Sequence, residues 1–365
     1  MAEREVFIVG AARTAIGTYG GTLKDTPLAD LATVPVKEAL ARSGAPLDAV
    51  GHLVMGTVVP TEPRDCYLSR VAAMNAGLPQ ETPAFNVNRL CGSGLQAIVS
   101  ATQAIRLGDA DIAVGAGAEA MSRGPYNLPA MRFGARLSDS VVIDFVEGAL
   151  RDPFQRMHMG VTAENVAERY GISRDDQDAL ALSSQQRAIR AIDEGRFKDQ
   201  IAAVQVKSRK GPVAFDTDEF PRRDATAEQL GKLKPVFKKE GGSVTAGNAS
   251  GLNDGAGAVV LAEGGAVKSH NLKPLARIVA YAHAGVEPAY MGIGPVPATH
   301  AVLKRAGLKV SDLDVIEANE AFAAQACAVA KELKFDPDKV NPNGSGIALG
   351  HPIGGTGAII TVQAL

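Results

Sequence analysis

Three polar side chains occur where turns or strand ends would expose them to a ligand. Cys91 lies in "NVNRLCGSGLQAI", between an extended-looking segment and a glycine-rich helix start. His351 lies in "GSGIALGHPIGGTGAI", another glycine-rich turn before an apolar helix, and Asn319 opens "NEAFAAQ" after the strand-like run "LDVIEA". A thiol and an imidazole can act as nucleophile and base. Sites in α/β proteins form at the carboxyl ends of strands, so these residues predict a catalytic site built on Cys91.

The position of Cys91 predicts partial activation of its thiol. A helix N-terminus stabilises a nearby negative charge by at most ~2 kcal/mol. One pKa unit corresponds to about 1.4 kcal/mol, so we expect the helix to lower the thiol pKa by roughly one unit from its reference near ~8.5. That shift is too small to produce a thiolate at neutral pH. A base is still required, and His351 is the candidate.

The other cysteines and histidines have weaker claims to chemistry. Cysteine is most often a small buried hydrophobe, and Cys327 in "AFAAQACAVAKEL" fits that role. Cys66, which follows Arg64 and Asp65, fits a loop or helix start. The remaining histidines are His52, His158, His270, His283 and His300, and none forms an HxxxH or HExxH pattern, so no metal is expected.

One glycine-rich motif is a false lead. "GAGAEA" from Gly115 matches the short dinucleotide-binding pattern and follows a strand-like run. A loop rich in proline and arginine follows it, where a dinucleotide-binding unit would have a long amphipathic helix. We therefore do not expect dinucleotide binding.

The elements that must hold these residues alternate between strand and helix patterns, which predicts an α/β fold with a mostly parallel sheet covered by helices. The pattern restarts after Val267, and the two series align in order: "VNRLCGSG" resembles "VNPNGSG", and "DAVGHLVMG" occupies the place of "DLDVIEANE". We interpret this as two copies of one βα half, packed about a pseudo-twofold axis.

The repeat predicts three parts of the chain. Residues 1–120 form the first half, completed by about 251–267, where "GAGAVVLAE" reads as a strand. Residues 268–365 form the second half, which stops inside its last helix, so we expect strands of the second sheet to be missing. Residues 121–250 form an inserted loop domain, in which Ser173 of "ISRDDQ" is the expected N-cap of a helix.

Composition excludes several functional classes. A net charge of -2 without long charge runs argues against nucleic acid or an acidic membrane as partner. Three widely spaced cysteines favour free thiols and a reducing compartment. The N-terminus lacks the pattern of a signal or transit peptide, and no apolar stretch approaches the ~20 residues that span a bilayer. We therefore predict a cytoplasmic protein.

Five motifs together give a more specific assignment: "NRLCGSGLQA", "HMGVTAEN", "TAGNASGLNDGA", "EANEAFAAQ" and "NPNGSGIALGHPIGGTGA". With these in order, the sequence resembles a thiolase of the acetyl-CoA acetyltransferase or β-ketothiolase group over essentially its whole length. The resemblance implies a layered αβαβα core made of two duplicated βα halves, plus an inserted loop domain.

The resemblance also implies roles for the site residues. Cys91 would be the nucleophile that accepts the acyl group, and His351 would be the base that takes its proton. Asn319 would hold a water that forms an oxyanion hole together with His351. Coenzyme A would be bound as a substrate, with no permanently bound cofactor. Its binding residues would be His158, Met159, Arg222, Ala246, Ser250 and Phe322, with Arg223 as an alternative to Arg222.

The implied reaction is a reversible, ping-pong Claisen condensation of two acetyl-CoA molecules to acetoacetyl-CoA and CoA, or thiolysis of short 3-ketoacyl-CoA. The family uses a second cysteine, in a C-x-G motif, as acid and base. This chain ends before such a motif, so we expect it to be a truncated form whose condensation step is in doubt. The segment "GPYNLPAMRFGARL" resembles the family's tetramer-forming loop and implies a dimer of dimers.

Three other functions remain open at this stage. Cysteine, histidine and asparagine also form sites in cysteine hydrolases, although the order Cys91, Asn319, His351 disfavours that class. A ketoacyl-synthase-like enzyme would need a second histidine where Asn319 stands. A non-catalytic acyl-CoA or lipid carrier on the same scaffold would have no need of an activated thiol.

Overall fold

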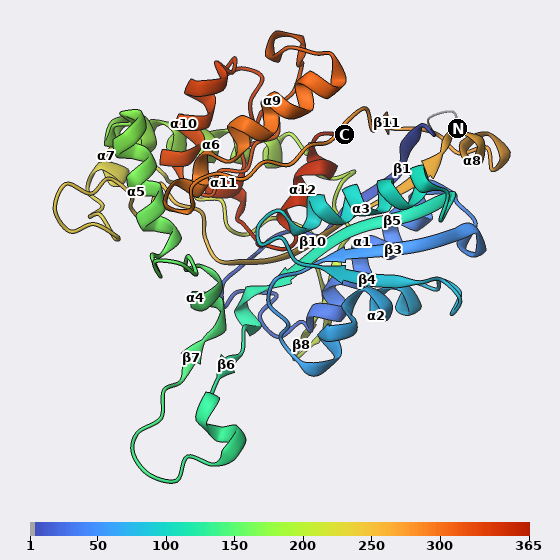
Figure 1. The fold of residues 1–365 in the computed structure, drawn as a ribbon, viewed down its shortest axis with the longest axis horizontal. Coiled ribbons are helices and arrows are strands. Elements are labelled where there is room, and N and C mark those ends of the chain that lie inside the picture. Colours follow the sequence, from blue (N-terminus) through green and yellow to red (C-terminus); the bar gives the residue numbers. More distant parts are fainter. Residues whose placement is uncertain (1–3) are drawn as a thin grey trace.

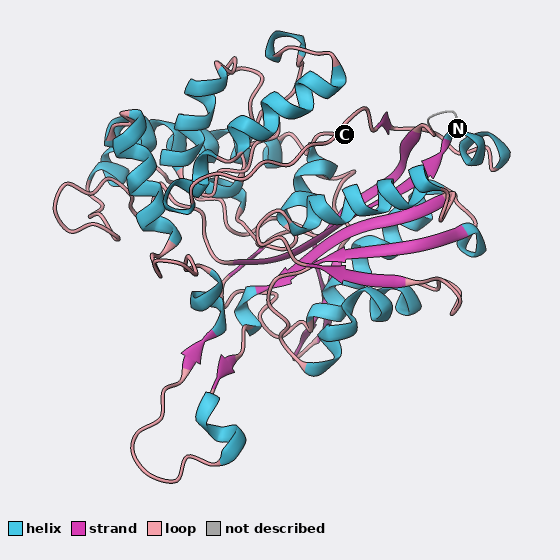
Figure 2. Ribbon diagram, viewed as in Figure 1, coloured by secondary structure: helices cyan, strands magenta, loops and turns pink. Residues whose placement is uncertain are grey.

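A computed structural model describes residues 4–365, and its largest element is a seven-stranded mixed sheet (Figures 1 and 2). The strand order is β11, β1, β10, β5, β3, β4, and β2 also pairs with β10. The bounds are β1 Val6–Arg13, β2 Gly17–Thr18, β3 Val50–Gly56, β4 Ala84–Val87, β5 Ile112–Ala120, β10 Asn253–Glu263 and β11 Ala276–Arg277.

The directions of the strands correct one prediction. β3 pairs in parallel with β4 and β5, but β10 is antiparallel to both β1 and β5, so the sheet is not mostly parallel. The antiparallel strand is the late segment that was expected to complete the first half. It enters from the inserted region and takes a central place, where every residue except Glu263 is buried.

Helices cover both faces of this sheet (Figure 1). One face packs against α1 (Leu28–Ser43) and α2 (Leu68–Asn75) around a large apolar cluster. The other face packs against α3 (Ser93–Leu107) and α12 (Thr356–Gln363), which come from the first and second halves of the chain.

Glycines allow α3, α12 and the sheet to approach one another closely. A Cβ on Gly94 of α3 would lie 2.6 Å from the backbone nitrogen of Ala358, and one on Gly357 of α12 would lie 2.3 Å from that of Leu95. This reciprocal contact fits two related helices packed about a pseudo-twofold axis. The glycines of "GAGAEA" serve the same purpose, since a Cβ on Gly115 would lie 2.6 Å from Ile98 Cα.

The second half contains mainly helices in the described residues. They are α9 Pro295–Ala306, α10 Ala323–Leu333 and α11 Gly346–Leu349, besides α12, and α8 Gly264–Ser269 lies at the junction of the two halves. The strand-like run "LDVIEA" forms only one parallel bridge, between Ile316 and Val340. Within residues 4–365 this pair has no further strand beside it, and an isolated two-stranded pairing is marginal in water.

The inserted region contributes helices that pack against α10 and α11 of the second half, and it forms a long projection. Its helices are α4 Phe145–Ala149, α5 Met159–Tyr170, α6 Arg174–Asp193 and α7 Ala227–Gly231, and its strands are β6 Tyr126–Asn127, β7 Ile143–Asp144, β8 Val204–Ser208 and β9 Gly211–Phe215. Figure 1 shows the loop between β6 and β7 extending away from the body of the molecule. Ser173 caps α6 in a capping box with Asp176, as predicted.

Candidate active site

A cavity of about 1080 Å³ brings together most of the predicted site residues. Cys91, Asn319 and His351 line it, although they lie far apart in the sequence. Four of the predicted coenzyme A residues line it as well: His158, Met159, Ser250 and Phe322. Arg222 and Ala246 lie outside this lining and are exposed. The cavity is large enough for a substrate of cofactor size.

Cys91 sits in the turn between β4 and α3, as the sequence predicted. Leu90 adopts a positive φ of 47°, and the turn is fixed by the Ser93 hydroxyl, which accepts from Arg89 N at 2.8 Å and donates to Leu90 O at 2.6 Å. Ser93 begins α3, and Gly92 is its N-cap. The thiol therefore lies just before a helix N-terminus, held by its neighbours' side chains and backbone.

The electrostatic prediction for Cys91 is wrong in direction. Burial raises the pKa of the thiol to about 11, and the nearby negative charge of Glu119 adds to this effect. Desolvation of the thiolate outweighs the field of the helix because Cys91 packs against apolar side chains, among them Val58, Met121 and Ile353. The need for a base is therefore stronger than the sequence suggested.

His351 is buried in the loop between α11 and α12, where its backbone N–H donates to Asn253 Oδ1 at 2.9 Å. Its Nδ1 lies 2.6 Å from Thr356 Oγ1, and the Thr356 hydroxyl donates to Pro352 O at 3.0 Å. A hydroxyl that donates its proton to a carbonyl can only accept from the ring. This network assigns the ring proton to Nδ1 and leaves Nε2 unprotonated, so Nε2 is the nitrogen that can accept a proton.

The charge state of His351 suits that role. Burial lowers the pKa of the imidazole from its usual 6.5 to about 4, so the ring is neutral at pH 7. A neutral imidazole can take a proton, whereas a charged one cannot. The high pKa of Cys91 and the low pKa of His351 also mean that a resting thiolate and imidazolium pair is not populated.

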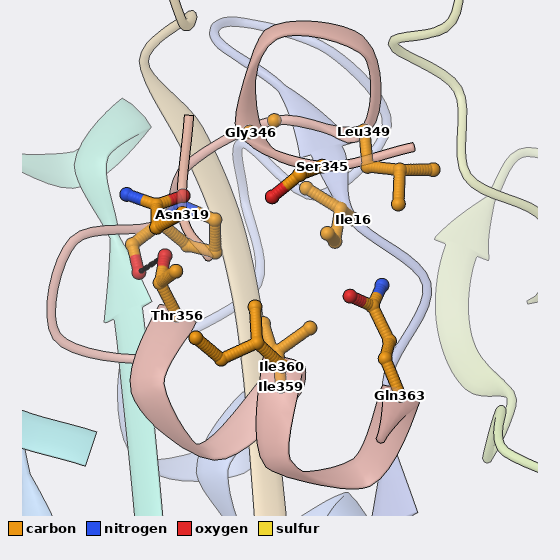
Figure 3. A pocket seen from close by; sticks show the side chains of 11 residues that line it. Ile16, Asn319, Ser345, Gly346, Leu349, Thr356, Ile359, Ile360 and Gln363 are labelled. Atoms are coloured by element: carbon orange, nitrogen blue, oxygen red, sulfur yellow. Dashed lines mark hydrogen bonds between the residues drawn. The ribbon is translucent and has the colours of Figure 1, made fainter. Parts of the chain in front are cut away.

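Asn319 lies against the His351 ring, with its Nδ2 3.4 Å from both ring nitrogens. Figure 3 shows Asn319 beside Thr356 at the edge of a small space, which Ile16, Ser345 and Ile359 also line. This space measures about 10 Å³, roughly the room that one water needs. The Asn319 side chain is thus placed between the base and a space of water size.

An aromatic row forms another wall of the cavity. His158 is the N-cap of α5, and its ring stacks on Phe237 with centroids 4.7 Å apart. Phe237 in turn meets Phe322 edge to face at 6.2 Å. Outside the cavity, Arg223 pairs with Asp193 at 2.7 Å, so of the two neighbouring arginines Arg222 is the one not committed to that ion pair.

Sequence reasoning missed four residues at this site. Thr356 orients the base, Phe237 extends the aromatic wall, and Glu119 lies near the nucleophile. Glu317 lines the cavity with both carboxylate oxygens unpartnered within residues 4–365, and burial raises its pKa to about 8. Glu119 and Glu317 could have been suspected because each carboxyl group lies at or near the end of an apolar strand-like run.

The remaining cysteines agree with their predicted roles. All three thiols are free; Cys66 is exposed in a short 3-10 helix (Pro63–Tyr67), and Cys327 packs against the apolar cluster of α5 and α10.

In the described part of the chain, no group of three or more histidine, cysteine or acidic side chains could hold a metal ion. No helix of residues 4–365 is long and apolar enough to cross a membrane.

Comparison of the sequence with known proteins identifies one family over almost the whole chain. The family profile "Thiolase, N-terminal domain" matches residues 6–265, and "Thiolase, C-terminal domain" matches residues 272–365. Beta-ketothiolase BktB of Cupriavidus necator is 64% identical over 362 residues, which cover 99% of this chain and 92% of that protein.

Solved structures agree with the fold. The acetyl-CoA acetyltransferase of Bacillus anthracis superposes with a TM-score of 0.97 at 47% identity, covering 99% of this chain and 91% of that one. Human mitochondrial 3-ketoacyl-CoA thiolase in complex with CoA gives a TM-score of 0.95 at 47% identity, covering 99% and 90%. The predicted fold class is thereby confirmed.

Proposed function

The chain belongs to the thiolase family, and we propose that it is an acetyl-CoA acetyltransferase that works through an acyl-Cys91 intermediate. The reaction is the reversible Claisen condensation of two acetyl-CoA molecules, or thiolysis of a short 3-ketoacyl-CoA. The observation that carries the proposal is that the Cys91 thiol and the neutral His351 imidazole, with Nε2 unprotonated, line one cavity.

In the first half-reaction, Cys91 Sγ attacks the thioester carbonyl while its proton passes to His351 Nε2. The new bond between Sγ and the acyl carbon forms, the bond from that carbon to the sulfur of CoA breaks, and the leaving thiolate takes the proton from His351. Attack and proton transfer must be coupled, because the pKa values of the resting groups oppose an ion pair. His351 and a water held by Asn319 would stabilise the negative carbonyl oxygen.

The proposed path of CoA follows the aromatic wall. His158 and Met159 flank the pantetheine, Ser250 and Phe322 line the route to Cys91, and Ala246 lies toward the outer end. Arg222 is assigned to the nucleotide end, where its exposed guanidinium can meet a phosphate. In this proposal residues 121–250 are the loop domain that binds CoA.

Condensation additionally requires a base that removes the Cα proton of the second acetyl-CoA. Within residues 4–365, Cys91 is the one thiol that lines the cavity. The described residues therefore support the acylation step directly.

We also propose a homotetramer, with the loop between β6 and β7 as an intersubunit contact. This loop exposes Phe133 and Leu137 by 89% and 91%, and several other large apolar side chains beside them. Apolar side chains so exposed mark contact sites.

Three unpaired thiols favour a reducing compartment, for which we propose the cytoplasm.

Intact-mass analysis after brief exposure to acetyl-CoA tests the acylation step. We expect a single acetyl adduct on the wild-type chain and on the Cys327→Ala control, and none on Cys91→Ala. An adduct that persists in Cys91→Ala would rule out the proposed nucleophile. Tight CoA binding without any adduct on a folded chain would favour the non-catalytic carrier.

A further inference from the structure

A fully buried carboxylate that the proposed reaction does not use lies at the carboxyl end of β5. Glu119 has no solvent-exposed surface. A buried carboxylate costs free energy unless it is well hydrogen-bonded. Its partners therefore indicate what the residue does.

The partners of Glu119 are hydrogen-bond donors from two distant loops. Oε2 accepts from Val58 N at 3.0 Å and from Gly354 N at 2.8 Å, while Oε1 accepts from Val59 N at 3.0 Å. The Thr57 hydroxyl lies 3.4 Å from Oε1. Burial raises the pKa of Glu119 to about 7, and the three backbone N–H groups oppose that shift. Three of these four partners can only donate, so the site is built for the ionised carboxylate.

One of these loops supports the nucleophile. Val58 and Val59 belong to the apolar cluster against which Cys91 packs. The segment 57–59 is also hydrogen-bonded to the end of β4 and the residue after it. Thr57 N donates to Val87 O at 3.2 Å, and Asn88 Nδ2 donates to Val58 O at 3.3 Å.

The other loop carries the base. Gly354 follows His351 by three residues, and a Cβ at Gly354 would lie 2.5 Å from Glu119 Oε2. The loop therefore approaches the carboxylate at a distance that only glycine permits. Glu119 thus connects the segment that supports Cys91, in the first half of the chain, to the loop that carries His351, in the second half.

We propose that Glu119 is a positioning residue that fixes the Cys91 turn and the His351 loop relative to each other, and whose negative charge adds to the effect of burial on the resting thiol. The inference rests on the proposed roles of Cys91 and His351. A protonated resting thiol resists oxidation and alkylation, since the thiolate is the reactive form. The thiol then loses its proton to His351 only as the thioester is attacked.

The proposed effect of the Glu119 charge on the Cys91 thiol can be tested with iodoacetamide. The rate of alkylation of Cys91 is measured as a function of pH, with peptide mapping to identify the modified cysteine. Glu119→Gln keeps the side-chain volume but removes the charge, so we expect the alkylation midpoint to fall measurably below that of the wild-type chain, while burial still holds it above the usual value for a thiol. Glu119→Asp keeps the charge, so its midpoint should stay near that of the wild-type chain. Acetylation of Cys91 should slow at least about tenfold in both variants, because neither side chain can satisfy all three N–H groups.

Glu164→Gln is the matched control. Glu164 is also buried and also accepts from backbone N–H groups, those of Ser243 and Val244, but in α5, within residues 121–250. We expect Glu164→Gln to lose stability as any variant of a buried, hydrogen-bonded carboxylate would. The pH midpoint for alkylation of Cys91 should stay unchanged.

An unchanged midpoint in folded Glu119→Gln would overturn the proposal. If that variant does not fold, a wild-type rate of acetylation in Glu119→Asp would overturn it instead. The alkylation assay needs no acetyl-CoA, so it reports on the coupling of Glu119 to Cys91 even if the acylation test fails.

Discussion

Cys91 and His351 are both neutral at pH 7 because burial opposes charge in each of them. For the thiol this raises the pKa to about 11, and for the imidazole it lowers the pKa to about 4. Sequence position alone indicated the opposite direction for Cys91, since a helix N-terminus is visible in the sequence and the depth of burial is not. The depth of burial determines how the two groups can share a proton.

Slow alkylation of Cys91 at neutral pH follows from this burial. We expect the rate of reaction with iodoacetamide to be low at pH 7 and to rise toward a midpoint near the pKa of about 11. Exposed Cys66 provides an internal comparison on the same chain. A midpoint below 8 would contradict the raised pKa and would indicate a resting thiolate.

Thr356 fixes the tautomer of His351, so its loss should impair the base. Thr356→Val keeps the shape but leaves the ring N–H at Nδ1 without an acceptor, which costs about 1–3 kcal/mol. We expect the rate of Cys91 acetylation to fall about tenfold to a hundredfold, with Thr356→Ser restoring most of it. Thr102→Val is a control, because Thr102 is equally buried but bonds only Ile98 O of its own helix. An unchanged rate in Thr356→Val would show that Thr356 does not orient the base.

At the scale of elements, local patterns predicted most of the first half. The strand and helix around Cys91, the capping box at Ser173 and the returning strand β10 were all visible as apolar runs, turns and caps. The antiparallel direction of β10 was not visible, because it depends on where the inserted region returns the chain. The second half showed the same local patterns, yet Ile316 forms only one bridge, since strands also depend on their neighbours.

The contact between α3 and α12 can be tested by adding a methyl group. Gly357→Ala would place a Cβ 2.3 Å from the backbone nitrogen of Leu95, so one of the two helices would have to move. We expect the free energy of unfolding to fall by about 2–3 kcal/mol. Gly231→Ala is the matched control, because an added Cβ there meets nothing within 4 Å. Equal stability of the two variants in thermal unfolding would show that the helices are less closely packed than described.

At the scale of the whole molecule, the projecting loop should determine the assembly. Replacing Phe133 and Leu137 by aspartate removes the two most exposed large apolar side chains of the loop between β6 and β7. We expect light scattering to show a fall from tetramer to dimer, with acetylation of Cys91 retained. Leu107→Asp, a change at an exposed leucine elsewhere, should leave the assembly intact. An unchanged mass in the double variant would contradict the proposed contact.

Stability against acid should also reflect the buried histidine. The folded state holds the His351 pKa near 4, while the unfolded chain has it near 6.5, so the unfolded state binds more protons between these values. Stability from this group is therefore present above pH 6.5 and is lost as the pH falls toward 4. Between pH 7.5 and pH 5 the loss amounts to about 2 kcal/mol.

Other buried groups act in the opposite direction and must be separated from this effect. The raised pKa values of Glu119 and Glu317, about 7 and about 8, give stability that increases as the pH falls from 8 toward 4.5. The difference between wild-type and His351→Asn isolates the histidine, because both proteins share the two carboxyl groups. We expect urea unfolding to show a loss on acidification that is about 2 kcal/mol smaller in His351→Asn, whereas the exposed-site control His270→Asn should follow the wild-type chain. Equal losses in all three proteins would mean that folding does not lower the pKa of His351, and would contradict the desolvation described for the ring.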